Sequence, residues 1–282
     1  ASELSEKGGN SEDSGFALAW LEWSLLYKGE FEKVLEVGKK LLRTMDRTFN
    51  IYWYAWGVCG ISRAYTCLGR WDEAIEESLK VMNRAESHSD NNMLCFAGLN
   101  LCLAHISRGN LSQAIEYGEL LLQKAITPAD KAWIQRSLGW ALCRSGEWKR
   151  GIELMKEALP LFKAGKFMPG IVPIQCTLGE GYLLAGDYEK ANKTLKEAIG
   201  IFEKCGTRFY LGWAHRLLGE IFSKTSANNT AEHFEKSIDI LKNIKAIIFD
   251  MDGTLVDNIP FHRKAWISFL EKHGIILAPE DF

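Results

Sequence analysis

The stretch CLGRWDEAIEESLKVM (residues 67–82) decides the fold, because its glycine turn followed by an amphipathic helical pattern recurs along the chain. The other copies are YKGEFEKVLEVGKKLL (27–42), SRGNLSQAIEYGELLL (107–122), RSGEWKRGIELMKEAL (144–159) and LAGDYEKANKTLKEAI (184–199). The turn glycines, Gly29, Gly69, Gly109, Gly146 and Gly186, are separated by 40, 40, 37 and 40 residues. A sixth copy, GEIFSKTSANNTAEHFEKSIDIL (219–241), has a polar loop in place of the glycine turn. This period predicts helical hairpins that stack in sequence order.

Each position of the repeat has a structural reason. The glycine lies between two helical patterns, where a left-handed residue ends the first helix. The aromatic residue or leucine two positions later, such as Trp71 or Trp148, is expected to anchor the second helix on the first. Small residues should let the helix backbones approach each other closely. These are Ala74, Ala114, Gly151 and Ala191, with the glycines of SLGWAL (137–142), TLGEGY (177–182) and LLGEIF (217–222).

This spacing of glycine, aromatic residue and alanine resembles the tetratricopeptide repeat family, over roughly residues 15–243. The family repeats about every 34 residues. The longer step here is similar to the variant in sensory arms of signal-transduction ATPases, bacterial cyclases and transcription regulators. The resemblance implies an all-α, right-handed superhelical solenoid with a concave inner surface. We therefore expect a polar segment (1–14), about six repeats (15–243) and a separate C-terminal segment (244–282).

The first helix of each repeat lines the concave groove in this family, and partners bind there. The corresponding positions in this chain are rich in aromatic residues and arginine, which often anchor protein interfaces. The candidate partner-binding residues are Trp23, Tyr27, Trp56, Arg63, Phe96, Trp133, Arg136, Trp140, Arg144, Trp213, Arg216 and Glu220. For each aromatic ring, a place in the core between repeats stays open. For each arginine, the alternative that it pairs with a glutamate or complements the dipole at a helix end also stays open.

The composition restricts the partners and the compartment. Lys and Arg total 34 against 36 Asp and Glu, so no sequence-wide field favours nucleic acid or a membrane surface. Seven cysteines stand singly, which argues against disulfides or a zinc site and favours the cytoplasm. The opening ASELSEKGGNSEDSG lacks a signal-peptide core. We predict a cytoplasmic protein with a protein or peptide partner, no nucleic acid or membrane partner and no cofactor. The oligomeric state stays open.

Residues 245–282 break the repeat pattern. KAIIFD (245–250) is typical of a buried strand, DMDGT (250–254) of a turn, and PFHRKAWISFLEKHGI (260–275) of an amphipathic helix. Strand, DxDGT and helix together resemble the first motif of the haloacid dehalogenase-like phosphohydrolases. The following DNIPFHRKAW (257–266) is similar to the start of the cap in their β-phosphoglucomutase-like branch.

The resemblance implies a chemical role for two aspartates. Asp250 would be the nucleophile and Asp252 the general acid and base, and Asp250 with the backbone of Asp252 would hold Mg²⁺. The family also needs a Ser or Thr on a second strand, a Lys and an acidic pair. Only 28 residues follow Thr254, and they cover one predicted helix and a short tail, so they cannot supply these three partners. We therefore expect a truncated fragment without catalysis. Its origin as a natural fusion, a truncation or an artificial joining stays open, and the start at Ala1 suggests a piece of a longer protein.

The leading hypothesis is a non-catalytic scaffold that binds a peptide or a partner domain in its groove. The competing hypothesis is a magnesium-dependent phosphatase or phosphomutase that uses Asp250 and Asp252, if the rest of that domain is supplied elsewhere. In a third hypothesis the repeats are the sensory arm of a signalling ATPase or cyclase. No GxxxxGK[ST] loop occurs in the chain, so that catalytic part would lie outside it.

Overall fold

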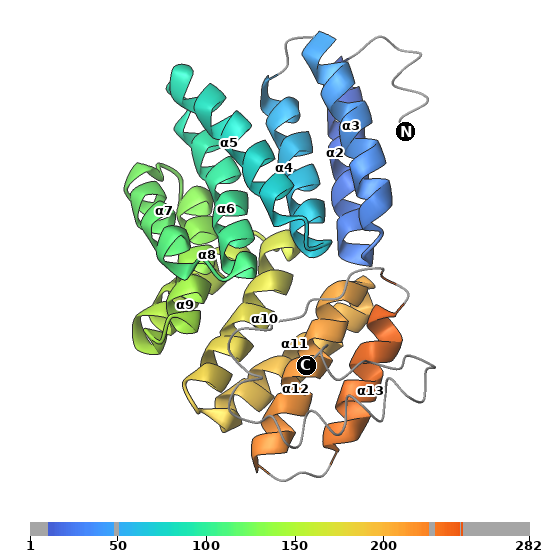
Figure 1. The fold of residues 1–282 in the computed structure, drawn as a ribbon, viewed down its shortest axis with the longest axis vertical. Coiled ribbons are helices and arrows are strands. Elements are labelled where there is room, and N and C mark those ends of the chain that lie inside the picture. The colour runs from blue at the N-terminus through green and yellow to red at the C-terminus, as the bar shows by residue number, and fades with distance from the viewer. Residues whose placement is uncertain (1–10, 48–50, 226–228, 243, 245–282) are drawn as a thin grey trace, which may run out of the picture. The chain divides into compact units, whose positions relative to one another are not determined.

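Helical hairpins follow one another in the computed structural model, which describes residues 11–47, 51–225, 229–242 and 244 (Figure 1). The helices are α2 (Ser11–Lys28), α3 (Phe31–Arg47), α4 (Ile51–Cys67), α5 (Trp71–Ser87), α6 (Asn91–Arg108), α7 (Leu111–Lys124), α8 (Pro128–Arg144), α9 (Trp148–Ala164), α10 (Met168–Leu184), α11 (Tyr188–Cys205), α12 (Arg208–Thr225) and α13 (Thr230–Leu241). No strand occurs among the described residues. The predicted all-α repeat architecture is therefore confirmed.

Contacts divide the chain into two units, residues 1–247 and 248–282. The whole second unit lies outside the described residues, and so do Asp250, Asp252 and the helix predicted at 260–275. Helix α2 begins at Ser11, inside the segment that we expected to precede the repeats. The predicted borders at 14/15 and 243/244 stay predictions. Within the described part, no helix has both the length and the apolar character of a membrane span.

The predicted turn glycines end the first helices as expected. All five have a positive φ, from 74° at Gly69 to 98° at Gly146. A side chain is strained in this region, which explains why glycine recurs at this place in the repeat. In the sixth hairpin, Asn229 takes a left-handed conformation (φ 66°) directly before α13. Asparagine tolerates this conformation better than most residues.

Small residues lie at the helix crossings, as predicted. Ala74, Ala114 and Ala191 are fully buried. Between α8 and α9, a Cβ added to Gly139 would lie only 2.6 Å from the carbonyl oxygen of Gly151. The two helices therefore approach so closely that only glycine fits at this crossing.

The predicted anchoring role is wrong for Trp148. This side chain is 43% exposed, and no ring contact is found for it among the described residues. Phe31, at the same repeat position, is only 3% exposed because Phe209 of α12 covers it, with the ring centroids 5.7 Å apart. The aromatic residue at the start of a second helix is thus buried only where another repeat supplies a cover.

The single step of 37 residues has a local cause. Helix α7 has 14 residues, whereas α5 and α9 each have 17. It ends at Lys124 because Thr127 and Asp130 form a capping box that begins α8, with Pro128 in the first turn. The shortened repeat brings the start of α8 to the pocket described below.

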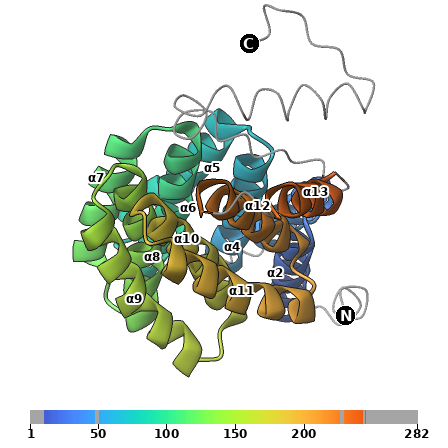
Figure 2. The same cartoon turned by 90° about the horizontal axis from the view of Figure 1, so that it is seen from below.

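The first helices of the hairpins form a closed series. Helices α2, α4, α6, α8, α10 and α12 pack on one another in sequence order, and α12 also packs on α2. Figure 2 shows the inner helices α2, α4, α6, α8, α10 and α12 from below. The solenoid therefore returns to its first helix, and the inner faces of these six helices enclose an interior.

Candidate functional site

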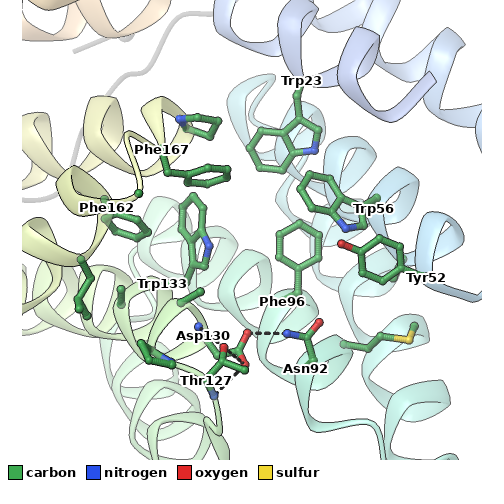
Figure 3. A pocket seen from close by; sticks show the side chains of 18 of the residues that line it. Trp23, Tyr52, Trp56, Asn92, Phe96, Thr127, Asp130, Trp133, Phe162 and Phe167 are labelled. Carbon is green, nitrogen blue, oxygen red and sulfur yellow. Dashed lines mark hydrogen bonds between the residues drawn. The ribbon is translucent and has the colours of Figure 1, made fainter. Parts of the chain in front are cut away.

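An aromatic pocket of about 560 Å³ opens among the inner helices (Figure 3). Its walls come from α2, α4, α6, α8, the last turn of α9, the connection between α9 and α10, and the start of α10. Seven of the nineteen lining residues are tryptophan or phenylalanine, and within the described residues Asp130 is the only charged group in the lining. We call this site the aromatic pocket.

One wall is a cluster of rings from three consecutive inner helices. Trp56 and Phe96 have centroids 4.9 Å apart, and Trp23 stacks on Phe96 at 6.3 Å. Trp56 and Phe96 occupy the same repeat position, since 40 residues separate them. Stacked repeats place equivalent residues side by side. An aromatic residue at the same position of two consecutive repeats therefore forms this part of the wall.

The opposite wall combines a repeat position with the connection before α10. Trp133 of α8 follows Phe96 by 37 residues and contacts Phe162 of α9 at 4.9 Å, edge to face. Phe167 lies nearly perpendicular to Trp133 at 5.8 Å. Such edge-to-face contacts are favourable for aromatic rings and hold them in fixed orientations.

The polar edge of the pocket is internally satisfied. Asp130 is 6% exposed, and its carboxylate accepts hydrogen bonds from Asn92 Nδ2 at 2.8 Å and Thr127 Oγ1 at 2.7 Å. The Thr127 hydroxyl accepts in turn from the backbone N–H of Asp130 at 3.1 Å. A carboxylate held by these donors fixes the start of α8 and links it to α6.

A buried donor remains beside the rings. The indole Nε1 of Trp23, whose side chain is 4% exposed, has no hydrogen-bond partner among the described residues. A buried N–H without an acceptor costs free energy, about 1–3 kcal/mol. The aromatic pocket can therefore hold an apolar group, and the buried indole N–H of Trp23 is a candidate hydrogen-bond donor beside it.

Four of the predicted partner-binding residues line the aromatic pocket. These are Trp23, Trp56, Phe96 and Trp133. The other eight lie elsewhere in the repeat unit: Tyr27, Arg63, Arg136, Trp140, Arg144, Trp213, Arg216 and Glu220. None of the twelve is fully exposed. Contact of any of them with a partner stays a prediction.

The second group lies deeper between the inner helices. Tyr27 donates its hydroxyl hydrogen to the carbonyl oxygen of Pro169 at 2.7 Å, and burial raises the pKa of this phenol. Trp140 and Trp213 have ring centroids 5.3 Å apart. These contacts join helices on different sides of the closed series, so part of the predicted groove surface is core.

Two of the predicted arginines are paired with glutamates. Arg144 lies 3.8 Å from Glu180 of α10, and Arg216 pairs with Glu220 one turn further along α12. Charge pairing was the alternative that the sequence left open for these residues. The structure thus shows a partner within the chain for both arginines.

The sequence also contained signals for pocket residues that were not predicted. Tyr52 lies one helical turn before Trp56, and Asn92 lies one turn before Phe96, so each shares a helix face with a predicted residue. Thr127 and Asp130 match the spacing of a capping box. Phe167 had no such signal, because it lies in a connection outside the repeat pattern.

No family model matches the chain. The Rap conjugation gene regulator of the plasmid pLS20, solved in complex with the Phr* peptide, aligns with a TM-score of 0.61 and 13% identity, covering 86% of this chain and 77% of that chain. PlcR of Bacillus thuringiensis, solved with the peptide PapR7 and DNA, aligns with a TM-score of 0.59 and 15% identity, covering 77% of this chain and 84% of that chain. A Rap protein complexed with competence and sporulation factor aligns with a TM-score of 0.58 and 13% identity, covering 83% of this chain and 67% of that chain.

At these identities the likeness shows the fold, which is a tetratricopeptide-like helical solenoid. A curated relative matches a short stretch. Hexitol phosphatase A of Escherichia coli (strain K12) is 49% identical over 37 residues, which are 13% of this chain and 16% of that protein. The chain therefore spans about a sixth of the length of the phosphatase that it matches.

Proposed function

We propose that the repeat unit is a scaffold that binds an extended peptide segment, with a large apolar side chain of the peptide in the aromatic pocket. The convergence of Trp23, Trp56, Phe96 and Trp133 from four inner helices carries the proposal. The volume of about 560 Å³ falls within the range of ligand sites, about 300–1,000 Å³.

Two of the similar solved structures support a peptide ligand. The pLS20 Rap regulator was solved with the Phr* peptide and PlcR with the peptide PapR7. The PlcR complex also contains DNA, so the comparisons do not support our expectation that nucleic acid is excluded. Its exclusion here rests on the formal net charge of −2 alone.

The lining defines the ligand chemistry. Rings on two opposite walls favour an aromatic or branched aliphatic side chain, because dispersion and burial of apolar surface supply the affinity. The free indole N–H of Trp23 would donate to a carbonyl oxygen of the peptide backbone. The ligand would thus combine one apolar anchor with one backbone hydrogen bond.

Binding of defined peptide pools tests the proposal. The affinities of fluorescent heptapeptides with a central Phe, Leu or Trp are measured by fluorescence anisotropy and compared with that of heptapeptides with a central Ser. We expect tighter binding of the apolar pools, and a loss of roughly tenfold or more in Trp133→Ala, since truncating an interface tryptophan commonly costs at least about 2 kcal/mol. Trp148→Ala is the matched control, because Trp148 is exposed and outside the pocket. Equal affinity for the Ser pool, or an unchanged Trp133→Ala, would contradict the proposal.

We also propose that the scaffold is the regulatory arm of a signalling protein in the cytoplasm and has no catalytic role or cofactor. The fold shared with gene regulators supports a regulatory role. Co-purification of the natural full-length product from cytosolic extract, followed by identification of any attached catalytic domain, tests this part. Recovery only with membranes would contradict it.

A second candidate function concerns the C-terminal segment alone. The 37-residue match to Hexitol phosphatase A favours a phosphohydrolase origin for part of the chain. Under this candidate Asp250 and Asp252 transfer a phosphoryl group with Mg²⁺ if the rest of the domain is supplied elsewhere. With Mg²⁺ and p-nitrophenyl phosphate we expect no turnover by this chain. Turnover that is lost in Asp250→Asn would instead favour the enzyme.

A further inference from the structure

Two arginines lie inside the closed series of inner helices, and neither has a carboxylate partner in the part of the chain that the structure describes. Arg136 of α8 is 1% exposed, and no described residue accepts a hydrogen bond from its Nε or Nη2. Arg63 of α4 is 8% exposed, and its Nη2 donates to the hydroxyl oxygen of Tyr210 at 2.9 Å. By contrast, Arg144 and Arg216 are each paired with a glutamate of the chain.

The surroundings of the Arg136 guanidinium do not offset its charge. Among the described residues, the ionisable groups that act on Arg136 are Arg63, Tyr210 and Tyr27. Burial, and then the like charge of Arg63, lower the pKa of Arg136 to about 9. A buried charge without a counter-ion is expensive, whereas a buried charge with a well-placed partner is tolerated.

The pair lies next to the aromatic pocket. The guanidinium carbon of Arg136 lies 5.6 Å from the ring centroid of Trp133, which lines the pocket. On the other side, Tyr27 follows the pocket residue Trp23 by one helical turn, and their ring centroids are 6.2 Å apart. A ligand that fills the pocket would therefore contact Trp133, whose ring lies against Arg136.

We propose that Arg63 and Arg136 form an anion subsite that receives a carboxylate of the bound peptide, either its C-terminus or an Asp or Glu side chain. Two guanidinium forks match the geometry of a carboxylate and form charge-assisted hydrogen bonds with it. The inference rests on the proposed peptide-binding function and adds the chemistry of the ligand. Arg136 does not line the pocket itself, so a neighbouring pocket side chain moves aside when the carboxylate enters.

Three peptide pools with the same apolar anchor test the subsite by fluorescence anisotropy. The first has a C-terminal amide and no acidic residue, the second a free C-terminal carboxylate, and the third an amide and one Asp. We expect the second or the third pool to bind roughly 10- to 100-fold more tightly than the first, and the better pool identifies the source of the carboxylate. Arg136→Met should abolish this preference. Arg150→Met should keep it, because Arg150 is exposed and paired with Glu119.

Stability without peptide separates this role from a structural one. Arg136→Met removes an unpaired buried charge and should raise the midpoint of thermal unfolding, whereas loss of a structural arginine would lower it. If Arg136→Met does not fold, Arg136→Lys keeps the charge without the fork and should reduce the preference for acidic peptides.

The outcomes also distinguish the two proposals. Equal binding of all three pools that is still weakened by Trp133→Ala overturns the anion subsite and leaves the peptide scaffold intact. Failure of every pool to bind overturns both. A preference for acidic peptides that persists in Arg136→Met and in Arg63→Met also overturns the subsite.

Discussion

Tyr27 of α2 and Tyr210 of α12 lie with their ring centroids 5.8 Å apart, although they belong to the first and the sixth hairpin. Phe31 and Phe209 form a second contact between the same repeats. In an open solenoid each repeat contacts only its neighbours. Here the first and the last repeat also stabilise each other, so changes at this junction should affect the whole repeat unit.

The Tyr210→Phe variant tests the junction. It removes the hydroxyl that accepts from Arg63 Nη2 and leaves the ring contacts in place. We expect the free energy of unfolding to fall by about 1–3 kcal/mol, because a buried charged donor loses its acceptor. Urea unfolding followed by circular dichroism measures the change. Tyr188→Phe should be nearly neutral, because its ring is only partly buried and its hydroxyl has no hydrogen-bond partner among the described residues.

The Gly139→Ala variant tests the close crossing of α8 and α9. Its Cβ would lie 2.6 Å from the carbonyl oxygen of Gly151, and overpacking of this kind costs about 1–3 kcal/mol. Gly200→Ala is the matched control in α11, since a Cβ there meets nothing within 4 Å. That control should gain up to about 1 kcal/mol from helix propensity. Similar unfolding midpoints for the two variants would contradict the packing of α8 on α9.

The pair His215 and His233 predicts a loss of stability in mild acid. Their Nδ1 atoms are 2.9 Å apart, and burial, then the charges of His233 and Lys236, lower the pKa of His215 to about 4, while Glu232 opposes this shift. The unfolded state then binds more protons below about pH 6.5, so the stability present above that pH is lost as the pH falls towards 4.

Thermal unfolding at pH 7.5 and 5.5 measures this effect. We expect the stability of His215→Phe to fall by about 1 kcal/mol less between these two pH values than that of the unaltered chain. The variant keeps an aromatic ring at this position but has no titrating group there. His88→Gln is the control, since His88 is exposed. The prediction is wrong if both variants lose as much stability between the two pH values as the unaltered chain.

Thiol reactivity provides a further test of the packing. Cys205 is exposed, whereas the other six cysteines are buried. Burial raises the pKa of Cys67 to about 11 and that of Cys102 to about 12, so these thiols are neither accessible nor ionised at neutral pH. We expect one thiol per folded chain to react quickly with Ellman's reagent and all seven to react in guanidinium chloride. Fast labelling that persists in Cys205→Ser would show that the described packing is incorrect.

The sequence by itself determined the elements and their order. Gly69 and its equivalents need a positive φ, and Ala74 and its equivalents need close helix contact, so both signals are local and recur at a fixed spacing. The same spacing placed Trp56, Phe96 and Trp133 at equivalent positions, because stacking aligns them. The repeat pattern therefore predicted the fold and three of the aromatic residues that line the pocket.

Only the tertiary structure decided which of these residues face a pocket and which face the core. Closure of α12 on α2 depends on small rotations added over six hairpins, and no single repeat encodes their sum. That closure packs Tyr27 against Tyr210. Arg136 is buried, and no described residue accepts a hydrogen bond from its Nε or Nη2, although its repeat position predicted a groove surface. Phe167 joins the pocket from a connection outside the period. Local patterns specify helices and their neighbours, whereas contacts between distant repeats depend on the accumulated geometry of the whole unit.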